Sequence, residues 1–135
     1  FEEIKKHPVH GLEIVRTHKS LPNNAVRVIR HHHERYDGHG YPDGLNGTGI
    51  TEVARLSTVI DVYDALTTNR PYAPARTAYE ALDLMLMEMR QYFDMRLLRG
   101  FIRFLGPREM PTDAHQLLIE VSRRPADPDQ EASRS

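Results

Sequence analysis

Apolar residues recur at helical spacing along most of this chain, and no stretch alternates apolar and polar residues for long. Such periodicity is typical of amphipathic helices and not of strands, so it predicts an all-α fold. The expected helices cover residues 1–6, 8–18, 23–34, 51–68, 77–90 and 95–105. Residues 35–50 hold five glycines and a proline, which predicts a structured loop between two of the helices.

Local signals mark several helix ends. Pro8 is expected to open a helix, because proline is tolerated in a first turn. Thr77 and Glu80 form a capping-box pattern, Asp94 is a candidate cap for the last helix, and Gly106 is a stop signal. Beyond the helices, residues 115–122 have the pattern of a short strand. Residues 107–135 as a whole are expected to form an irregular or disordered tail.

Composition narrows the class of protein. The chain has 135 residues, 39% hydrophobic and 27% charged, as expected for one globular domain or part of one. Its formal net charge of -1 argues against a nucleic-acid polymer as partner, and no apolar run is long enough to insert into a membrane. The absence of cysteine excludes thiolate metal sites and is consistent with a cytoplasmic location. The sequence begins inside a helical pattern, so we expect it to be part of a longer protein.

Four of the eight histidines lie within residues 31–45. Ala25, Val28 and Ile29 mark the buried face of the preceding helix, and the same phase continues to His32 and His33. Two histidines on one apolar face are either hydrogen-bonded core residues or metal ligands. Neighbouring residues of a helix diverge by about 100°, so the pair fits either two ions or a frayed helix end.

The other two histidines of this region give weaker signals. His31 falls off the buried stripe, so we expect it on the surface, and His39 in the loop fits either role.

Acidic residues interrupt the apolar helix of residues 51–68. A stripe that begins at Ile50 passes through Asp61 and Asp64, while Leu56 and Ile60 make the rest of the helix apolar, so we expect it to be buried. A buried carboxylate is costly unless it is paired or coordinates a metal. For Asp64 an arginine partner competes with a metal, whereas for Asp61 we favour a metal. Histidine and carboxylate donors without thiolate suit iron, manganese or zinc.

Just beyond this helix, Arg70 and Tyr72 offer a guanidinium and a hydroxyl that could hold a substrate phosphate. A salt bridge from Arg70 to a nearby acid is an equal alternative.

Several motifs in order resemble the HD-GYP family, bacterial cyclic di-GMP phosphodiesterases within the HD phosphohydrolase superfamily. They are Lys6-His7-Pro8, the run from His32 to Leu45 with the signature Gly40-Tyr41-Pro42, Ala54-Arg55-Leu56, Asp61 to Thr67, and Arg70-Pro71-Tyr72. The resemblance covers about residues 1–105. It implies an all-helical fold of the HD type with a bi- or trinuclear metal centre, commonly iron or manganese, that activates a water for attack on phosphorus.

The resemblance also assigns residues to roles. Metal-ligand positions of the family are occupied by His7, His32, His33 and Asp61, and substrate-phosphate positions by Arg70 and Tyr72.

One departure concerns the family's His-Asp dyad, which lies upstream of the His-Pro motif. The sequence contains no His-Asp pair, so no catalytic dyad residue is assigned. We therefore expect residues 1–106 to be the C-terminal part of an HD-GYP-like domain that by itself binds metal weakly and hydrolyses little. Residues 91–95 also differ from the Phe-Asp-Pro turn that is usual there.

Two alternatives stay open beside cyclic di-GMP hydrolysis. One is a non-catalytic signalling module that docks diguanylate cyclase domains through Gly40-Tyr41-Pro42, and the other is hydrolysis of a different phosphoester. Receiver domains of two-component signalling commonly precede domains of this family. We also expect exposed apolar faces around Val28 and Ile60, which would favour a homo-oligomer.

Overall fold

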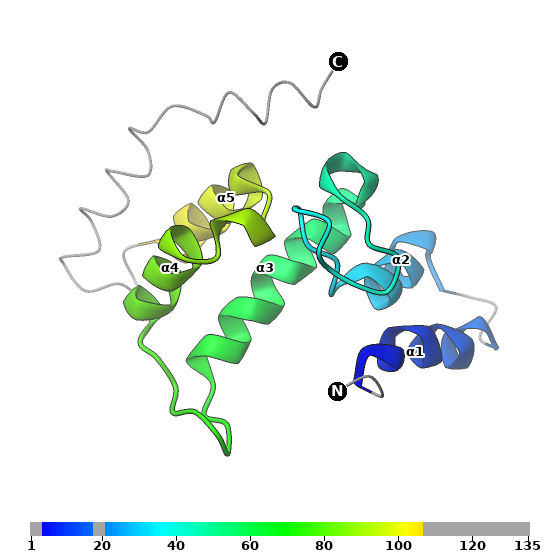
Figure 1. The fold of residues 1–135 in the computed structure, drawn as a ribbon, viewed down its shortest axis with the longest axis horizontal. Coiled ribbons are helices and arrows are strands. Elements are labelled where there is room, and N and C mark those ends of the chain that lie inside the picture. The colour runs from blue at the N-terminus through cyan, green and yellow to red at the C-terminus, as the bar shows by residue number, and fades with distance from the viewer. Residues whose placement is uncertain (1–3, 18–20, 107–135) are drawn as a thin grey trace. The chain divides into compact units, whose positions relative to one another are not determined.

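The computed structural model describes residues 4–17 and 21–106, which fall into two compact units (Figure 1). The elements are η1 (Ile4–Lys6), α1 (His7–Arg16), α2 (Asn23–His31), η2 (Gly47–Gly49), α3 (Glu52–Thr67), α4 (Ala78–Met87), η3 (Arg90–Tyr92) and α5 (Met95–Leu105). The described residues form no strand beyond an isolated bridge between Arg70 and Ala73, which confirms the all-α prediction. The expected strand at 115–122 and the tail at 107–135 lie outside the described residues. None of the described helices has the length and apolarity needed to cross a membrane.

The first unit contains residues up to Asp61 together with Gln91–Asp94. Within it α1 lies beside α2 (Figure 1). Pro8 stands in the first turn of α1, as predicted, and is fully buried. A Cβ on Gly11 would come within 3.3 Å of the Ile29 side chain, so the absence of a side chain there lets the two helices approach closely.

Helix α2 is shorter than predicted, since it ends at His31 and not at Glu34. His32 is the C-cap, and the chain turns immediately afterwards. Glu34 is 1% exposed and its carboxylate accepts hydrogen bonds from loop residues 9 and 11 positions further along the chain. These two tertiary hydrogen bonds compensate the buried charge of Glu34. If α2 continued to Glu34, the carboxylate would lose these partners, and this accounts for the end of the helix at His31.

Helix α3 has the predicted bounds to within one residue, but the prediction that it is buried all round was wrong. Ala54, Thr58 and Val59 are buried, whereas Ile60 is 48% exposed and the side chain of Asp61 is 52% exposed. The described part of the chain therefore covers one face of the helix. The expectation of an exposed apolar face holds around Ile60, while Val28 is half-buried.

Asp64 on the same helix is also exposed. It accepts a long hydrogen bond of 3.4 Å from the Thr68 hydroxyl, and no arginine partner appears among its described contacts. Of the two alternatives considered for Asp64, the arginine partner is therefore absent from the described part of the structure.

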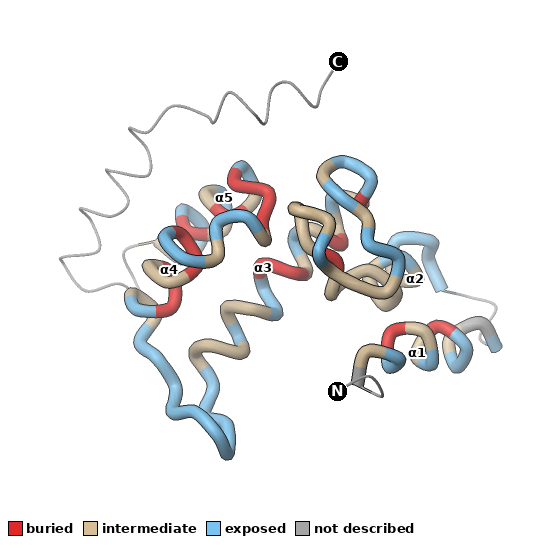
Figure 2. Tube along the Cα trace, viewed as in Figure 1, coloured by how far each residue is buried: buried red, intermediate tan, exposed pale blue. Residues whose placement is uncertain are grey.

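The second unit contains Val62–Arg90 and the chain from Met95 onward. The predicted capping box opens α4: Thr77 accepts from the Glu80 backbone N–H, and Glu80 accepts from that of Thr77. The buried face of this helix is Ala81, Leu82, Met85 and Leu86 (Figure 2). It ends at Met87, three residues before the predicted end.

Helix α5 packs against the last part of α3 in this unit, where the rings of Tyr63 and Phe101 meet edge to face with centroids 5.2 Å apart. Gly106 has a φ of 59° and its N–H bonds to the carbonyl of Ile102, so the predicted stop signal is confirmed.

Residues 91–94 belong to the first unit and contact the rest of it at Tyr92 and Asp94. The backbone N–H of Tyr36 donates to the carbonyl of Tyr92, and the Arg35 guanidinium lies 3.4 Å from the centre of the Tyr92 ring. Asp94 directly precedes α5, and its carboxylate lies 2.6 Å from Arg55 Nη1. This pair is buried, with side-chain exposures of 11% for the arginine and 6% for the aspartate.

Candidate metal centre

Three histidines from different parts of the first unit converge on one point. Nε2 of His7 lies 3.4 Å from Nε2 of His32 and 3.1 Å from Nε2 of His33. Nitrogen atoms of all three rings lie within 4.8 Å of one another. Imidazole nitrogens crowded in this way are typical of a metal site, because one metal ion can accept a lone pair from each of them.

Helix ends bring the three rings together. His7 is the first residue of α1, and His32 and His33 follow the last residue of α2. Because the helix has ended, the two adjacent side chains are not spread as they would be within a helix, and their ring centroids lie 4.1 Å apart. The sequence left two geometries open, two ions or a frayed helix end. The structure has the second: the helix ends before the pair, and the rings converge on one point.

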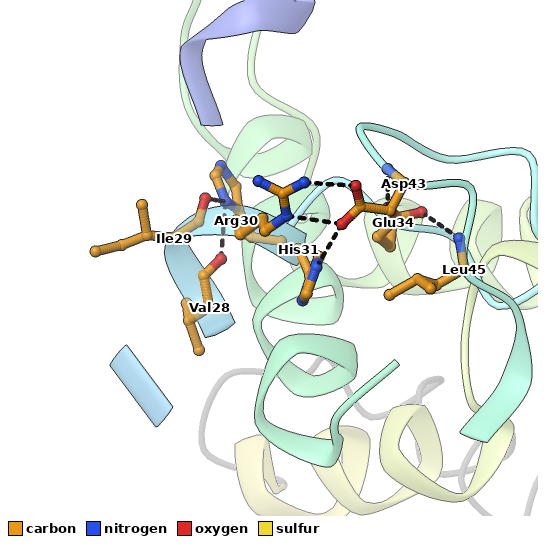
Figure 3. A network of polar contacts seen from close by, with 8 residues as sticks. Val28, Ile29, Arg30, His31, Glu34, Asp43 and Leu45 are labelled. Atoms are coloured by element: carbon orange, nitrogen blue, oxygen red, sulfur yellow. Dashed lines mark hydrogen bonds and ion pairs between the residues drawn. The ribbon is translucent and has the colours of Figure 1, made fainter. Parts of the chain in front are cut away.

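Backbone carbonyls orient His32. Its Nδ1 lies 3.0 Å from the carbonyl oxygens of both Val28 and Ile29 in the last turn of α2 (Figure 3). An Nδ1–H donating to these carbonyls leaves Nε2 with its lone pair directed at the cluster. This is the usual arrangement of a metal-binding histidine.

The electrostatics of the cluster favour a neutral imidazole at His33. Burial, together with the neighbouring His32 and His7 and partly opposed by Asp61, lowers the pKa of His33 to about 4. His33 is therefore neutral near pH 7, and the neutral form is the one that binds metal ions.

Asp61 lies beside the three histidines without joining them. Its Oδ2 is 4.0 Å from Nδ1 of His33, the nitrogen opposite to the one that meets His7. Three imidazoles with one adjacent carboxylate form a nitrogen and oxygen donor set, which suits iron, manganese or zinc. The residues present therefore fit the metal centre that the sequence implied.

The Gly-Tyr-Pro segment packs directly on this cluster. The ring of Tyr41 stacks on that of His33 with centroids 4.9 Å apart and planes 25° apart, and the Tyr41 N–H donates to the His33 carbonyl. Burial raises the pKa of the Tyr41 phenol, with a further contribution from the charge of Asp61. A Cβ on Gly40 would overlap the backbone N of Arg35 and lie 2.5 Å from Cα of Glu34, so only glycine fits there.

Two carboxylates fasten this loop to the end of α2 (Figure 3). Glu34 accepts from the N–H groups of Asp43 at 2.7 Å and of Leu45 at 3.0 Å. In return, the Asp43 carboxylate receives two 2.7 Å hydrogen bonds from Arg30 and lies 2.8 Å from Nε2 of His31. The Arg30 guanidinium, followed by His31, lowers the pKa of Asp43 to about 2. The sequence analysis did not identify either carboxylate as part of the site. The one signal in the sequence that could have indicated them was their position on either side of the Gly-Tyr-Pro segment.

The remaining candidates do not belong to the group of three rings. His31 is outside the cluster, as predicted, but it is not an open surface residue, because Asp43 holds it and its side chain is 14% exposed. His39 is exposed, with its N–H bonded to Asp37. Arg70 and Tyr72 belong to the second unit and are both exposed, on a turn closed by two hydrogen bonds between Arg70 and Ala73.

Comparison with known proteins agrees with the motifs. The model of the HD domain family matches residues 1–97. A cyclic di-GMP phosphodiesterase of Pseudomonas aeruginosa is 39% identical over 106 residues, which are 78% of this chain and 25% of that protein. A cyclic di-GMP phosphodiesterase response regulator of Xanthomonas campestris pv. campestris is 40% identical over 102 residues, 74% of this chain and 27% of that protein. A 3'3'-cGAMP-specific phosphodiesterase of Vibrio cholerae is 32% identical over 95 residues, 70% of this chain and 18% of that protein. The chain thus spans about a quarter or less of the length of these relatives, and it belongs to the HD-domain family.

Proposed function

We propose that this chain forms part of the metal centre of a phosphodiesterase that hydrolyses cyclic di-GMP. The observation that carries the proposal is the convergence of His7, His32 and His33, in which Nε2 of His7 lies 3.4 Å from Nε2 of His32 and 3.1 Å from Nε2 of His33. The names of the relatives from Pseudomonas aeruginosa and Xanthomonas campestris support the substrate. Residues 1–106 are then the C-terminal part of an HD-GYP-like domain.

In this proposal the three histidines hold the metal, and Asp61 supplies a carboxylate from the side of His33. Bound iron or manganese ions supply an activated water for in-line attack on phosphorus and offset the charge that develops on the phosphate. Arg70 and Tyr72 are proposed to bind the substrate phosphate through a guanidinium and a hydroxyl. The choice of iron or manganese follows from the family resemblance, and a cytoplasmic location is proposed from the absence of cysteine.

The test uses the full-length protein and four variants: His32→Ala, His33→Ala, Asp61→Ala and, as a matched control, His39→Ala. Metal content after loading with Mn²⁺ and the rate of ring opening of cyclic di-GMP are both measured. We expect the first three variants to lose metal and activity and the exposed His39→Ala variant to retain both. Unchanged metal content in His32→Ala and Asp61→Ala would refute the ligand assignment.

A second candidate substrate is 3'3'-cGAMP, because one relative with 32% identity over 70% of this chain carries that specificity in its name. Assaying both cyclic dinucleotides at equal concentration separates the two, since the better substrate has the larger kcat/KM. If neither is cleaved although metal is bound, another phosphoester or the non-catalytic module becomes the better proposal. Docking of diguanylate cyclase domains and formation of a homo-oligomer would then be tested by co-purification and by light scattering.

A further inference from the structure

We infer that Tyr41 is a positioning residue for His33: it holds the imidazole ring in the orientation in which Nε2 of His33 meets Nε2 of His7. The inference rests on the proposed function, because it concerns the same metal centre. Tyr41 does not itself belong to the cluster of metal-binding side chains. It acts on that cluster through the ring of His33.

His33 has greater need of such support than its neighbour. The ring of His32 is held by two backbone carbonyls at 3.0 Å from its Nδ1. The Nδ1 of His33 lies 4.0 Å from the nearest described carboxylate oxygen, on Asp61, which is too long for a hydrogen bond. His33 also lies beyond the last residue of α2, so no helical turn restricts its side chain.

Tyr41 supplies the missing constraint through two contacts. Its ring lies nearly parallel to that of His33, with planes 25° apart and centroids at 4.9 Å, an offset stack. Its N–H donates to the His33 carbonyl at 3.2 Å, so the backbones of the two residues are tied together as well. A ring held on one face has fewer orientations open to it, and a ligand that is already oriented binds its metal more tightly.

The loop keeps Tyr41 in this place. On one side, Gly40 lies so close to the backbone of residues 33–35 that no side chain fits. On the other, the Asp43 N–H is held by Glu34, and the Asp43 carboxylate is held by Arg30 (Figure 3). The backbone is thus fixed at Gly40 and at Asp43, on either side of Tyr41. The Tyr41 ring is therefore held in place against the imidazole of His33.

The experiment titrates the full-length protein with Co²⁺ alone and records both the dissociation constant and the visible absorption, which depends on coordination geometry. Tyr41→Leu removes the ring, Tyr41→Phe keeps it, and Phe104→Leu removes a ring that is 86% exposed on α5 as a control. For Tyr41→Leu we expect a dissociation constant about threefold to tenfold higher and a changed spectrum, from the usual strength of aromatic stacking. Tyr41→Phe and Phe104→Leu are expected to stay within about twofold of wild type with its spectrum.

The outcomes separate this inference from the proposed function. Wild-type affinity and spectrum in a folded Tyr41→Leu variant would overturn the positioning role while leaving the metal centre intact. Equal losses in Tyr41→Leu and Tyr41→Phe would also overturn it, because the hydroxyl and not the ring would then be responsible. Failure of the wild type to bind Co²⁺ would overturn both. If Tyr41→Leu does not fold, Asp43→Asn decides: it keeps the Tyr41 side chain but loosens the loop that holds this ring against His33, so unchanged cobalt affinity there refutes the inference.

Discussion

Replacing Glu34 with glutamine is expected to loosen the loop of residues 40–45 and to leave α4 undisturbed. The Glu34 carboxylate is 1% exposed and accepts from two backbone N–H groups, those of Asp43 at 2.7 Å and Leu45 at 3.0 Å. Glutamine has nearly the same shape but only one acceptor oxygen. One of the two N–H groups would therefore face an NH₂ group and lose its partner inside the protein.

The magnitude follows from these two bonds. A hydrogen bond to a charged group contributes about 1.5–3 kcal/mol, and a buried donor left without an acceptor costs about 1–3 kcal/mol. We therefore expect the free energy of loop opening to fall by about 2–3 kcal/mol. This corresponds to roughly 30- to 150-fold faster hydrogen exchange of the loop amides.

Hydrogen exchange of the Asp43 and Leu45 amides measures this opening directly. The amides of α4 report on global unfolding in the same sample, and Glu88→Gln, an exposed glutamate at the end of α4, is the matched control. We expect faster exchange in Glu34→Gln at the loop amides alone, and exchange at the wild-type rate in Glu88→Gln. That result would support the role of the Glu34 carboxylate in holding the loop. Wild-type exchange at both loop amides in Glu34→Gln would show that the carboxylate does not hold the loop.

Three further predictions concern stability. The pKa of Asp43 is about 2 in the folded chain against a usual 3.8, so its carboxylate stabilises the fold fully above about pH 5 and progressively less as the pH falls toward 2. Urea unfolding of wild type and Asp43→Asn should accordingly differ by about 1 kcal/mol near neutral pH and converge near pH 2, and a constant difference would contradict this. Asp94→Ala leaves the buried Arg55 guanidinium without its carboxylate and should lower the free energy of unfolding by about 3–5 kcal/mol. Thermal unfolding measures this loss, and an unchanged Tm would show that the ion pair does not stabilise the fold. Gly40→Ala should lower the urea midpoint by the equivalent of about 1–3 kcal/mol, whereas Gly49→Ala, with no atom within 4 Å of the added Cβ, should not.

Much of the fold follows from signals that act over a few residues. The capping box at Thr77 and Glu80 and the stop at Gly106 are bonds within one helical turn, so the residues that make them are visible in the sequence. The bounds of α3 follow for the same reason. The burial of α3 does not follow from local signals. It depends on what packs over Ile60 and Asp61, and no local sequence pattern records that.

The histidine cluster shows the same division. Helical phase and the family motifs pointed to His7, His32 and His33, and the sequence by itself thus determined which residues meet and which family they belong to. Only the tertiary structure decided how they meet. Glu34 takes its partners from 9 and 11 residues further along the chain, α2 ends early, and the two adjacent rings turn toward His7 instead of diverging. The physical reason is that a buried carboxylate must find hydrogen-bond donors, and here those donors come from a loop that only the folded chain brings near.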